Sequence, residues 1–445
     1  MIVLITLLAA AAAAGGYFVT DAARPKPTLS PPPPIPHAYV AAGASPATPA
    51  AGTTPPPPTT TGIARTLTPL LSAAGLRPSV RVDVLDVADG RQLFARAPTA
   101  PTAPASTAKL LTATAALAVL PADYRIATTV RRGAGGAVVL VGGGDPTLTG
   151  APGTAAGAYP DAARVADLAA QLRRAGVQPT RIVVDDSLFS GPSVSPKWAP
   201  EDVPSDYGAP ITAVMVDGGR AQPADPIRSA TPDLAAGHRL AAALGRAALP
   251  VVRGRAPAGA AVLATVRSAP LATLIAQMLQ ASDNVIAECL ARQVALAEHQ
   301  PASFAGAAAA VRDVLTRLGV DPGAGLVDGS GLAASDRVPA AALARVLRLA
   351  ATTARLRYVV SGLPVAAWSG TLAARFLRGA GRGAAGVVRA KTGTLTGVST
   401  LAGLVHDRSG RLLAFAFMAD HAGATATAEN DLDALAGRLA GCGCG

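Results

Sequence analysis

A proline-rich segment near the N-terminus sets the first limit on what this chain can fold into. Thirteen of its 38 prolines lie between Pro25 and Pro58, with threonine, alanine and serine around them. Such a segment cannot build a core, and it favours an extended, polyproline-like spacer, which we place at residues 21–61. The folded part is therefore expected within residues 62–445, which is long enough to bury a large core.

The stretch before this spacer is apolar and uncharged. Residues 2–19 form a run of 18 such residues, at the lower limit for a bilayer-spanning helix. We expect residues 1–20 to be either a cleaved signal peptide or an uncleaved membrane anchor. The sequence leaves both open, because small residues suited to cleavage are present but no lysine or arginine precedes the run. Either way, this layout is typical of an exported protein that acts outside the cytoplasm.

Composition excludes several classes of protein. Hydrophobic residues make up 50% of the chain, which excludes a wholly disordered protein. The net charge is +11, but the arginines are scattered and aromatic residues are only 3%, so we expect no nucleic-acid partner. The five histidines form no ligand pair and the three cysteines do not complete a metal-binding spacing, so neither a metal nor another cofactor is expected. Cys289 falls in an apolar helical pattern. Cys442 and Cys444 could form a bridge or react, but the glycine-rich end in which they lie favours a disordered tail.

Hydrophobic periodicity predicts a split α+β domain. Alternating valines predict a strand over 79–87, followed by a hairpin turn and a return strand over 91–96. Strands predicted near both ends of the chain enclose predicted helices, which suggests one domain built from residues 62–127 and 266–445, with residues 128–265 inserted. The other predicted elements are helices at 106–120, 161–175, 271–297, 303–318 and 424–439, and strands at 137–141, 181–184, 386–390, 398–406 and 411–418.

The first chemistry-bearing string is Ser106-Thr107-Ala108-Lys109, at the start of a predicted helix. Positions i and i+3 share a helix face, so Lys109 is expected beside Ser106 as a base beside a nucleophile. A serine hydroxyl needs a neighbour to take its proton, and a lysine can do this when burial or nearby cations lower its pKa. Taken alone, the string is more often an ordinary helix start with a solvated lysine.

The second string is Ser282-Asp283-Asn284. Its functional interpretation gives Ser282 a proton-relay role and Asn284 a contact to a substrate amide. Its structural interpretation is a helix break with the aspartate as cap.

The third string is Lys391-Thr392-Gly393-Thr394, at the end of a predicted strand. Lys391 would serve as a cation near a substrate carboxylate, with Thr392 and Thr394 binding that carboxylate. Gly393 would let the backbone approach the ligand closely. The alternative is an edge lysine before a turn.

Together and in this order, S-x-x-K, S-x-N and K-T-G form the signature of penicillin-recognising serine acyl-transferases. The sequence resembles the D-alanyl-D-alanine carboxypeptidase/endopeptidases, the class C low-molecular-mass penicillin-binding proteins, over about residues 62–421. It departs from that family's pattern at Ala366-Ala367, where Ala-Gly is usual, and at Ala419-Asp420, where an asparagine is usual. Further segments that carry the resemblance are Val141–Leu148 (V-G-G-G-D-P-T-L), Val184–Phe189 (V-D-D-S-L-F), Trp198, Tyr207, Val327–Leu332 (V-D-G-S-G-L), Ser361–Val365, Gly370–Leu372 and Arg375.

The resemblance implies an α+β fold of the penicillin-recognising serine DD-peptidase and β-lactamase-like type. This fold has a five-stranded antiparallel sheet flanked by helices, a helical cluster and an inserted α/β domain. The implied activity is that of a serine-type D-Ala-D-Ala carboxypeptidase, with or without endopeptidase activity, which trims peptidoglycan stem peptides at the cell wall. It also implies that β-lactams act as covalent inhibitors. The implied catalytic residues are Ser106, Lys109, Ser282, Asn284 and Lys391, with Thr392, Gly393 and Thr394 binding substrate.

Two other functions stay open at this point. A β-lactamase uses the same signature, but no glutamate is evidently placed to speed deacylation. A non-catalytic peptidoglycan-binding scaffold would keep the fold, although the three intact motifs argue against it.

Overall fold

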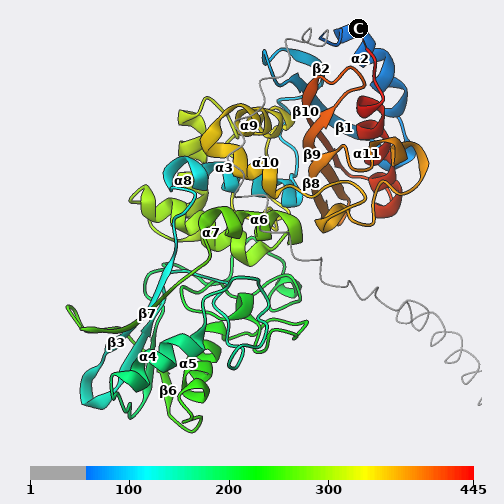
Figure 1. Ribbon diagram of the computed structural model, residues 1–445. Coiled ribbons are helices and arrows are strands. Elements are labelled where there is room, and N and C mark those ends of the chain that lie inside the picture. Colours follow the sequence, from blue (N-terminus) through cyan, green and yellow to red (C-terminus); the bar gives the residue numbers. More distant parts are fainter. Residues whose placement is uncertain (1–56, 445) are drawn as a thin grey trace, which may run out of the picture. The chain divides into compact units, whose positions relative to one another are not determined.

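The computed structural model describes residues 57–444, and elements are named as labelled in Figure 1. The predicted export segment, residues 1–20, and most of the predicted spacer lie outside the described residues. The first helix of the described residues, α2 (Thr60–Leu67), already begins at the end of the predicted spacer. Within residues 57–444, no helix has both the length and the apolar character needed to cross a membrane.

One antiparallel sheet joins the two ends of the described chain. Its strand order is β2-β1-β10-β9-β8, and β1 pairs with β10 along its whole length. The predicted hairpin of β1 and β2 is confirmed. The strands are β1 (Ser79–Asp86), β2 (Gln92–Arg96), β8 (Arg389–Leu395), β9 (Val398–His406) and β10 (Leu412–Asp420).

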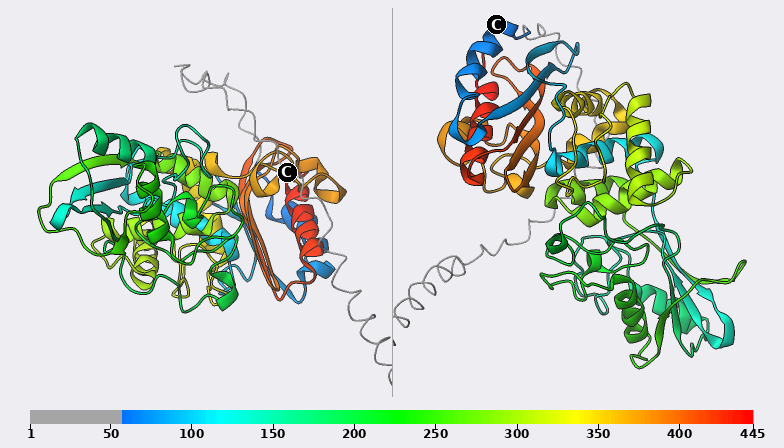
Figure 2. Two further views of the ribbon diagram at one scale, coloured as in Figure 1. Left: turned by 90° about the horizontal axis from the view of Figure 1, so that it is seen from below. Right: turned by 180° about the vertical axis from the view of Figure 1, so that it is seen from behind.

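The two faces of this sheet pack against different layers, because successive strand residues point to opposite sides. Phe415 and Phe417 of β10 lie in a core with α2 and α11 (Thr425–Ala440), whereas Ala416 and Met418 lie in a core with the helical cluster. Figures 1 and 2 show α11 against one face of the sheet and the cluster on the other side.

The helical cluster is formed by segments from both sides of the stretch predicted as the insertion. It consists of α3 (Lys109–Val119), α6 (Leu271–Ala281), α7 (Asn284–Ala297), α8 (Phe304–Arg317), α9 (Ala340–Thr352) and α10 (Arg357–Gly362). The single helix predicted over 271–297 is wrong: it is two helices, because Ser282 adopts a left-handed conformation with φ 56° and Asp283 caps the second helix.

A second five-stranded sheet occupies the stretch predicted as the insertion. Its order is β6-β5-β4-β3-β7, with parallel pairing between β4, β5 and β6 and antiparallel pairing of β3 with β4 and β7. Helices α4 (Val165–Arg174) and α5 (Pro232–Ala243) contribute to its core. The strands are β3 (Ala127–Arg132), β4 (Val138–Val141), β5 (Ile182–Asp185), β6 (Val251–Arg253) and β7 (Val262–Arg267).

The predicted disordered C-terminal tail is wrong. Cys442 and Cys444 are buried in the core shared by α2 and α11, and they are joined by a disulfide. The Thr59 amide donates a 2.7 Å hydrogen bond to the Cys444 carbonyl oxygen. The tail is therefore ordered by packing beside α2, where Figure 1 places the C-terminus. Cys289 is a buried free thiol, as its apolar pattern indicated.

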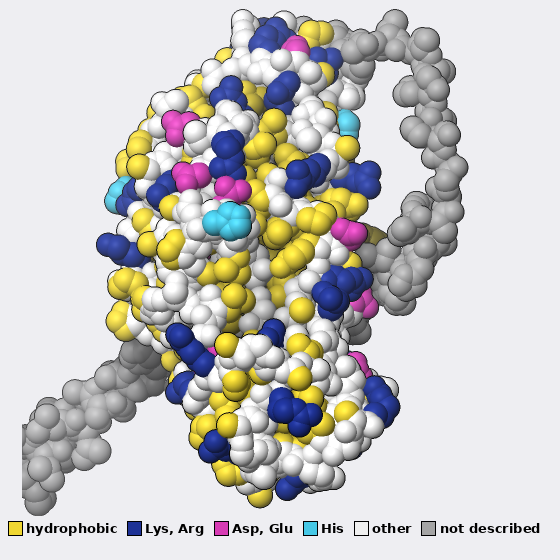
Figure 3. Space-filling view, turned by 90° about the vertical axis from the view of Figure 1, so that its left-hand side faces the viewer, with side chains coloured by type: hydrophobic (Ala, Val, Ile, Leu, Met, Phe, Trp, Pro, Cys, Tyr) yellow, Lys and Arg dark blue, Asp and Glu magenta, His cyan; other side chains and the backbone are white. Residues whose placement is uncertain are grey.

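The basic side chains do not gather into one block on the face drawn in Figure 3. Lysines and arginines there are interspersed with acidic and apolar side chains.

Candidate active site

Ser106 lies in a short 3-10 turn (Ala105–Ala108) that leads directly into α3. Residues i and i+3 eclipse in a 3-10 turn, which places the Lys109 Nζ 2.8 Å from the Ser106 Oγ. The preceding residue, Ala105, has φ 45°, a region that non-glycine residues rarely adopt. Its carbonyl packs tightly against Gly331, where an added Cβ would overlap the oxygen. Surrounding packing thus holds the turn in a strained conformation, as is common at functional sites.

Lys109 is fully buried and has three polar partners. Besides Ser106, its Nζ donates to the Asn284 Oδ1 at 2.6 Å and to the Ser330 carbonyl oxygen at 2.8 Å. Burial lowers the pKa of Lys109 to about 8, although the charges of buried carboxylates nearby partly oppose this shift. Those carboxylates belong to Asp328, Asp283, Glu288 and Asp336.

The chemistry of these partners orients the Lys109 amine. The amide oxygen of Asn284 and the carbonyl oxygen of Ser330 can only accept hydrogen bonds. A neutral amine therefore directs its two hydrogens at them, and its lone pair is left for the Ser106 hydroxyl. The arrangement suits a base that removes a proton from Ser106.

A second serine–lysine pair lies beside the first. The Lys391 Nζ donates to the Ser282 Oγ at 2.9 Å and to the Thr392 carbonyl oxygen at 2.8 Å. Burial, together with the positive charges of Lys109 and Arg375, holds the pKa of Lys391 well below its usual value. Both lysines are buried, whereas Ser106 and Ser282 are half-buried. The serines are thus the more accessible member of each pair.

The K-T-G string lies within β8, not after it. The predicted strand over 386–390 is wrong, because β8 spans Arg389–Leu395 in register with β9. A Cβ on Gly393 would lie 3.0 Å from the Ser106 amide nitrogen and 2.7 Å from the Pro104 carbonyl oxygen. Glycine is therefore what lets β8 approach the nucleophile turn so closely. The Thr392 Oγ1 donates to the Thr371 Oγ1 at 2.8 Å, and Thr394 is exposed.

Asp328 and Ser330 support the site, although no role was predicted for either from the sequence. Asp328 is fully buried and accepts hydrogen bonds from the amides of Ser330, Gly331 and Ala333 and from the Trp198 indole. This aspartate holds the turn whose Ser330 carbonyl accepts from Lys109. The string Val327–Leu332 pointed to this segment, but no local spacing indicates that its backbone meets Lys109.

Fold and site together define a class: a penicillin-recognising serine enzyme with two Ser–Lys pairs at the meeting point of sheet and helical cluster. Residues 71–225 and 223–440 match the model of the D-Ala-D-Ala carboxypeptidase 3 (S13) family. The chain therefore belongs to this family and is a serine-type D-Ala-D-Ala carboxypeptidase, as the sequence indicated.

Individual relatives agree with this assignment. A carboxypeptidase of Mycobacterium tuberculosis is 46% identical over 370 residues, 81% of this chain and 80% of that protein. Carboxypeptidase DacB of Mycolicibacterium smegmatis is 44% identical over 397 residues, 86% of each chain. The crystal structure of penicillin binding protein 4 from Haemophilus influenzae matches with a TM-score of 0.68 at 21% identity, covering 84% of this chain and 98% of that one. The last match supports the predicted fold.

Proposed function

We propose that Ser106 forms an acyl-enzyme with a peptidoglycan stem peptide, at the amide between its two terminal D-alanines. The observation that carries this proposal is the 2.8 Å contact between Ser106 Oγ and the buried Lys109 Nζ, whose other partners can only accept hydrogen bonds. In this assignment residues 62–127 and 266–445 form the peptidase domain, and residues 128–265 are inserted into it.

In acylation the Ser106 oxygen bonds to the carbonyl carbon while its proton moves to the neutral Lys109 amine. The amides of Ser106 and Thr394 would donate to the oxyanion. One such donor is worth about 2.7–4 kcal/mol in another serine hydrolase. The closeness of Gly393 to the Ser106 amide nitrogen supports this pairing of the nucleophile turn with β8.

Collapse of the tetrahedral intermediate breaks the carbon–nitrogen bond. The leaving nitrogen takes a proton from the Ser282 hydroxyl, and Lys391 resupplies Ser282 from its ammonium group. In deacylation a water oxygen bonds to the carbonyl carbon, and its proton passes through Ser282 to Lys391. Lys109 then returns its proton to Ser106 as the ester bond breaks, so both lysines regain their starting state.

The terminal carboxylate of the substrate would bind Lys391, Thr392 and Thr394. An anion beside a buried lysine favours its charged form. Substrate binding would therefore raise the lowered pKa of Lys391 and charge it for its role as proton donor. Asn284 would contact the substrate amide through its side chain.

β-Lactams are proposed to acylate Ser106, since their strained amide presents a carbonyl to the same nucleophile. A solved relative, penicillin binding protein 4 of Haemophilus influenzae, is described as a complex with a β-lactam. The export segment, residues 1–20, and the spacer, residues 21–61, would place the enzyme outside the cytoplasm. There it would be held at a membrane or secreted to the cell wall, within reach of peptidoglycan.

Mass spectrometry tests this function. Wild-type protein incubated with a stem pentapeptide is expected to release one alanine, and with penicillin it is expected to gain one covalent adduct on Ser106. A Ser106→Ala protein that still binds penicillin covalently would contradict the assignment. Pentapeptide bound but never shortened would favour the non-catalytic scaffold, and rapid multiple turnover of nitrocefin would favour the β-lactamase.

A further inference from the structure

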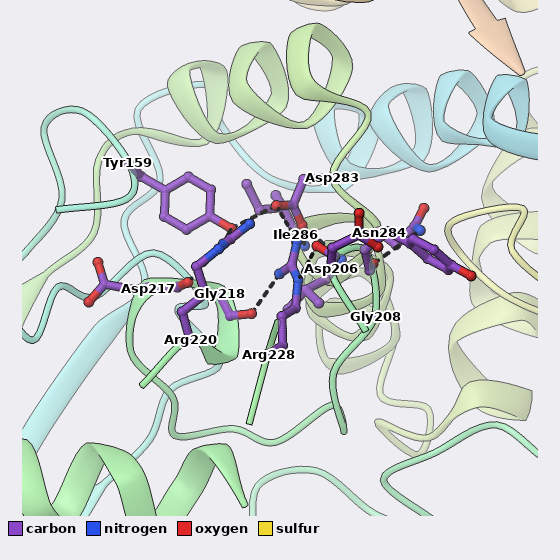
Figure 4. Close-up of polar contacts among 12 residues, drawn as sticks. Tyr159, Asp206, Gly208, Asp217, Gly218, Arg220, Arg228, Asp283, Asn284 and Ile286 are labelled. Atoms are coloured by element: carbon purple, nitrogen blue, oxygen red, sulfur yellow. Dashed lines mark hydrogen bonds and ion pairs between the residues drawn. The ribbon is translucent and has the colours of Figure 1, made fainter. Parts of the chain in front are cut away.

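The middle residue of the S-x-N string, Asp283, has no part in the chemistry proposed above, yet it is buried between the two catalytic groups of that string. It is 7% exposed. Figure 4 shows Tyr159 and Arg228, both from the stretch 128–265, beside its carboxylate.

One oxygen of this carboxylate determines where α7 begins. The Asp283 Oδ1 accepts from the amides of Val285 at 2.9 Å and Ile286 at 3.0 Å. This is an N-cap, which satisfies amides that a helix start leaves without partners. Because Asn284 is the first residue of α7, the cap also places the side chain that accepts from Lys109.

The other oxygen is held from the inserted stretch. The Asp283 Oδ2 accepts from the Tyr159 hydroxyl at 2.7 Å and from the Arg228 Nη2 at 3.0 Å. Arg228 is 4% exposed, and its Nη1 donates to the Gly218 carbonyl oxygen at 2.6 Å. A Cβ on Gly218 would overlap the Tyr159 hydroxyl, so this glycine lets the two donors converge. The guanidinium is thus braced on the insertion's own backbone while it holds Asp283 (Figure 4).

A third contact from the insertion orients the amide of Asn284. Its Nδ2 donates to the Tyr207 carbonyl oxygen at 3.2 Å. With the nitrogen used in this way, the Oδ1 is the atom left to face Lys109. The inserted stretch therefore contacts both residues that follow Ser282.

We propose that Arg228 and Tyr159 are positioning residues for the carboxypeptidase reaction, which act through Asp283 to hold Ser282 and Asn284 against the two catalytic lysines. Neither side chain is assigned a contact with the reacting atoms. This inference rests on the proposed acyl-enzyme chemistry, and it gives the insertion a role in catalysis that is separate from substrate binding.

The physical need for such a brace follows from the local backbone. Ser282 is a single left-handed residue between two helices, and its own side chain is bound through Lys391. Burial by itself would raise the pKa of Asp283, but the charge of Arg228 and the Tyr159 hydrogen bond lower it to about 2. The carboxylate is therefore charged at neutral pH and depends on these two donors, because a buried charge without its partner is strongly unfavourable.

The test compares the second-order rate constant for acylation of Ser106 by a fluorescent penicillin across variants. Arg228→Met is expected to lower it by about 10²-fold, the loss typical of a catalytic group displaced by about 1 Å. Tyr159→Phe keeps shape and core packing, and removes one hydrogen bond, so it is expected to lower the constant by about tenfold. With pentapeptide as substrate, kcat should fall while KM changes little.

The matched control is Leu240→Ala in α5. Leu240 is fully buried in the core of the inserted stretch, so its truncation should lower the melting temperature without altering acylation. The proposal is overturned if folded Arg228→Met and Tyr159→Phe acylate at the wild-type rate. It is also overturned if Leu240→Ala, at the same loss of melting temperature, slows acylation as much as the Arg228 and Tyr159 variants do. If Arg228→Met does not fold, Tyr159→Phe decides. If fluorescent penicillin does not label Ser106 in the wild-type protein, the proposed function itself is refuted.

Discussion

The two serine–lysine pairs of the site differ in how the chain builds them. Ser106 and Lys109 are one turn apart, whereas Ser282 and Lys391 are separated by 109 residues and meet only when β8 packs beside the end of α6. Their electrostatic surroundings differ as well. Lys109 lies among buried carboxylates, while Lys391 is influenced by Lys109 and Arg375.

This difference teaches what each lysine is suited to do. Burial lowers the pKa of Lys109, and the carboxylates limit this fall, so that its pKa is about 8. The amine can therefore both take and return a proton near neutral pH. Burial, with nearby cations adding to it, holds the pKa of Lys391 well below its usual value, so an arriving carboxylate changes its charge most. In the proposed mechanism the first lysine is the base, and the second senses and binds the substrate carboxylate.

The largest expected effect comes from removing the first lysine. Lys109→Met should lower the rate of Ser106 acylation by about 10⁴-fold, comparable to loss of the general base in other serine hydrolases. The measurement is the time course of covalent penicillin labelling, followed by mass spectrometry, with circular dichroism to establish that the variant is folded. A loss below about tenfold would show that another group takes the Ser106 proton.

Removing the second lysine should have a smaller effect that depends on the substrate. Lys391→Met is expected to lower kcat/KM for a pentapeptide by about 10²–10³-fold, through lost carboxylate binding and lost proton supply. The informative comparison uses the same peptide with its terminal carboxylate amidated. The variant should discriminate far less between the two peptides than the wild type does. Unchanged discrimination would assign the carboxylate to other residues.

The next effect in size is the pH dependence of Ser106 acylation, which should report the ionisation of Lys109. Because Lys109 acts as a base only when neutral, the acylation rate should rise through about pH 8. At pH 7 it should be about one-tenth of its plateau, since one unit below the pKa leaves a tenth of the amine neutral.

Glu288→Gln gives this profile a matched perturbation. The Glu288 charge raises the pKa of Lys109, so its loss should move the midpoint to lower pH. Burial raises the pKa of Glu288 itself to about 7, so it is mostly ionised at pH 8, where the profile has its midpoint. A midpoint that stays in place, or moves upward, would show that this carboxylate does not act on the Lys109 base.

The smallest expected effect concerns a position away from both pairs. Ala367 has φ 58°, where the resembled family usually has glycine. The left-handed conformation costs a non-glycine residue about 1–2 kcal/mol, and a glycine at this position would remove that cost. The greater chain entropy of glycine in the unfolded state offsets part of this gain in stability. Ala367→Gly should therefore raise the melting temperature by a few degrees at most, while acylation of Ser106 stays unchanged. A lower melting temperature would show that the methyl group packs usefully.

Much of the fold followed from local patterns. The apolar run over 398–406 predicted β9 with its observed limits, and alternating valines followed by a turn signal predicted the hairpin of β1 and β2. Where long-range contacts override local preference, prediction was wrong. The C-terminal tail is ordered by packing against α2. Strand β8 likewise lies later than predicted, because its register with β9 places it. The helix predicted over 271–297 instead breaks for a local reason, the Asp283 cap that the structural interpretation of the S-D-N string had offered.

The sequence by itself determined which chemical groups are available and in what order they occur along the chain. It also determined the close pairing of Ser106 with Lys109, since three-residue spacing at a helix start is a local geometric fact. Only the tertiary structure decided that Lys391 meets Ser282, that the Ser330 carbonyl and Asn284 share Lys109, and that Arg228 and Tyr159 hold Asp283. The physical reason is that pKa and orientation depend on burial and on neighbours distant in sequence, which exist only once the sheet, the helical cluster and residues 128–265 have packed together.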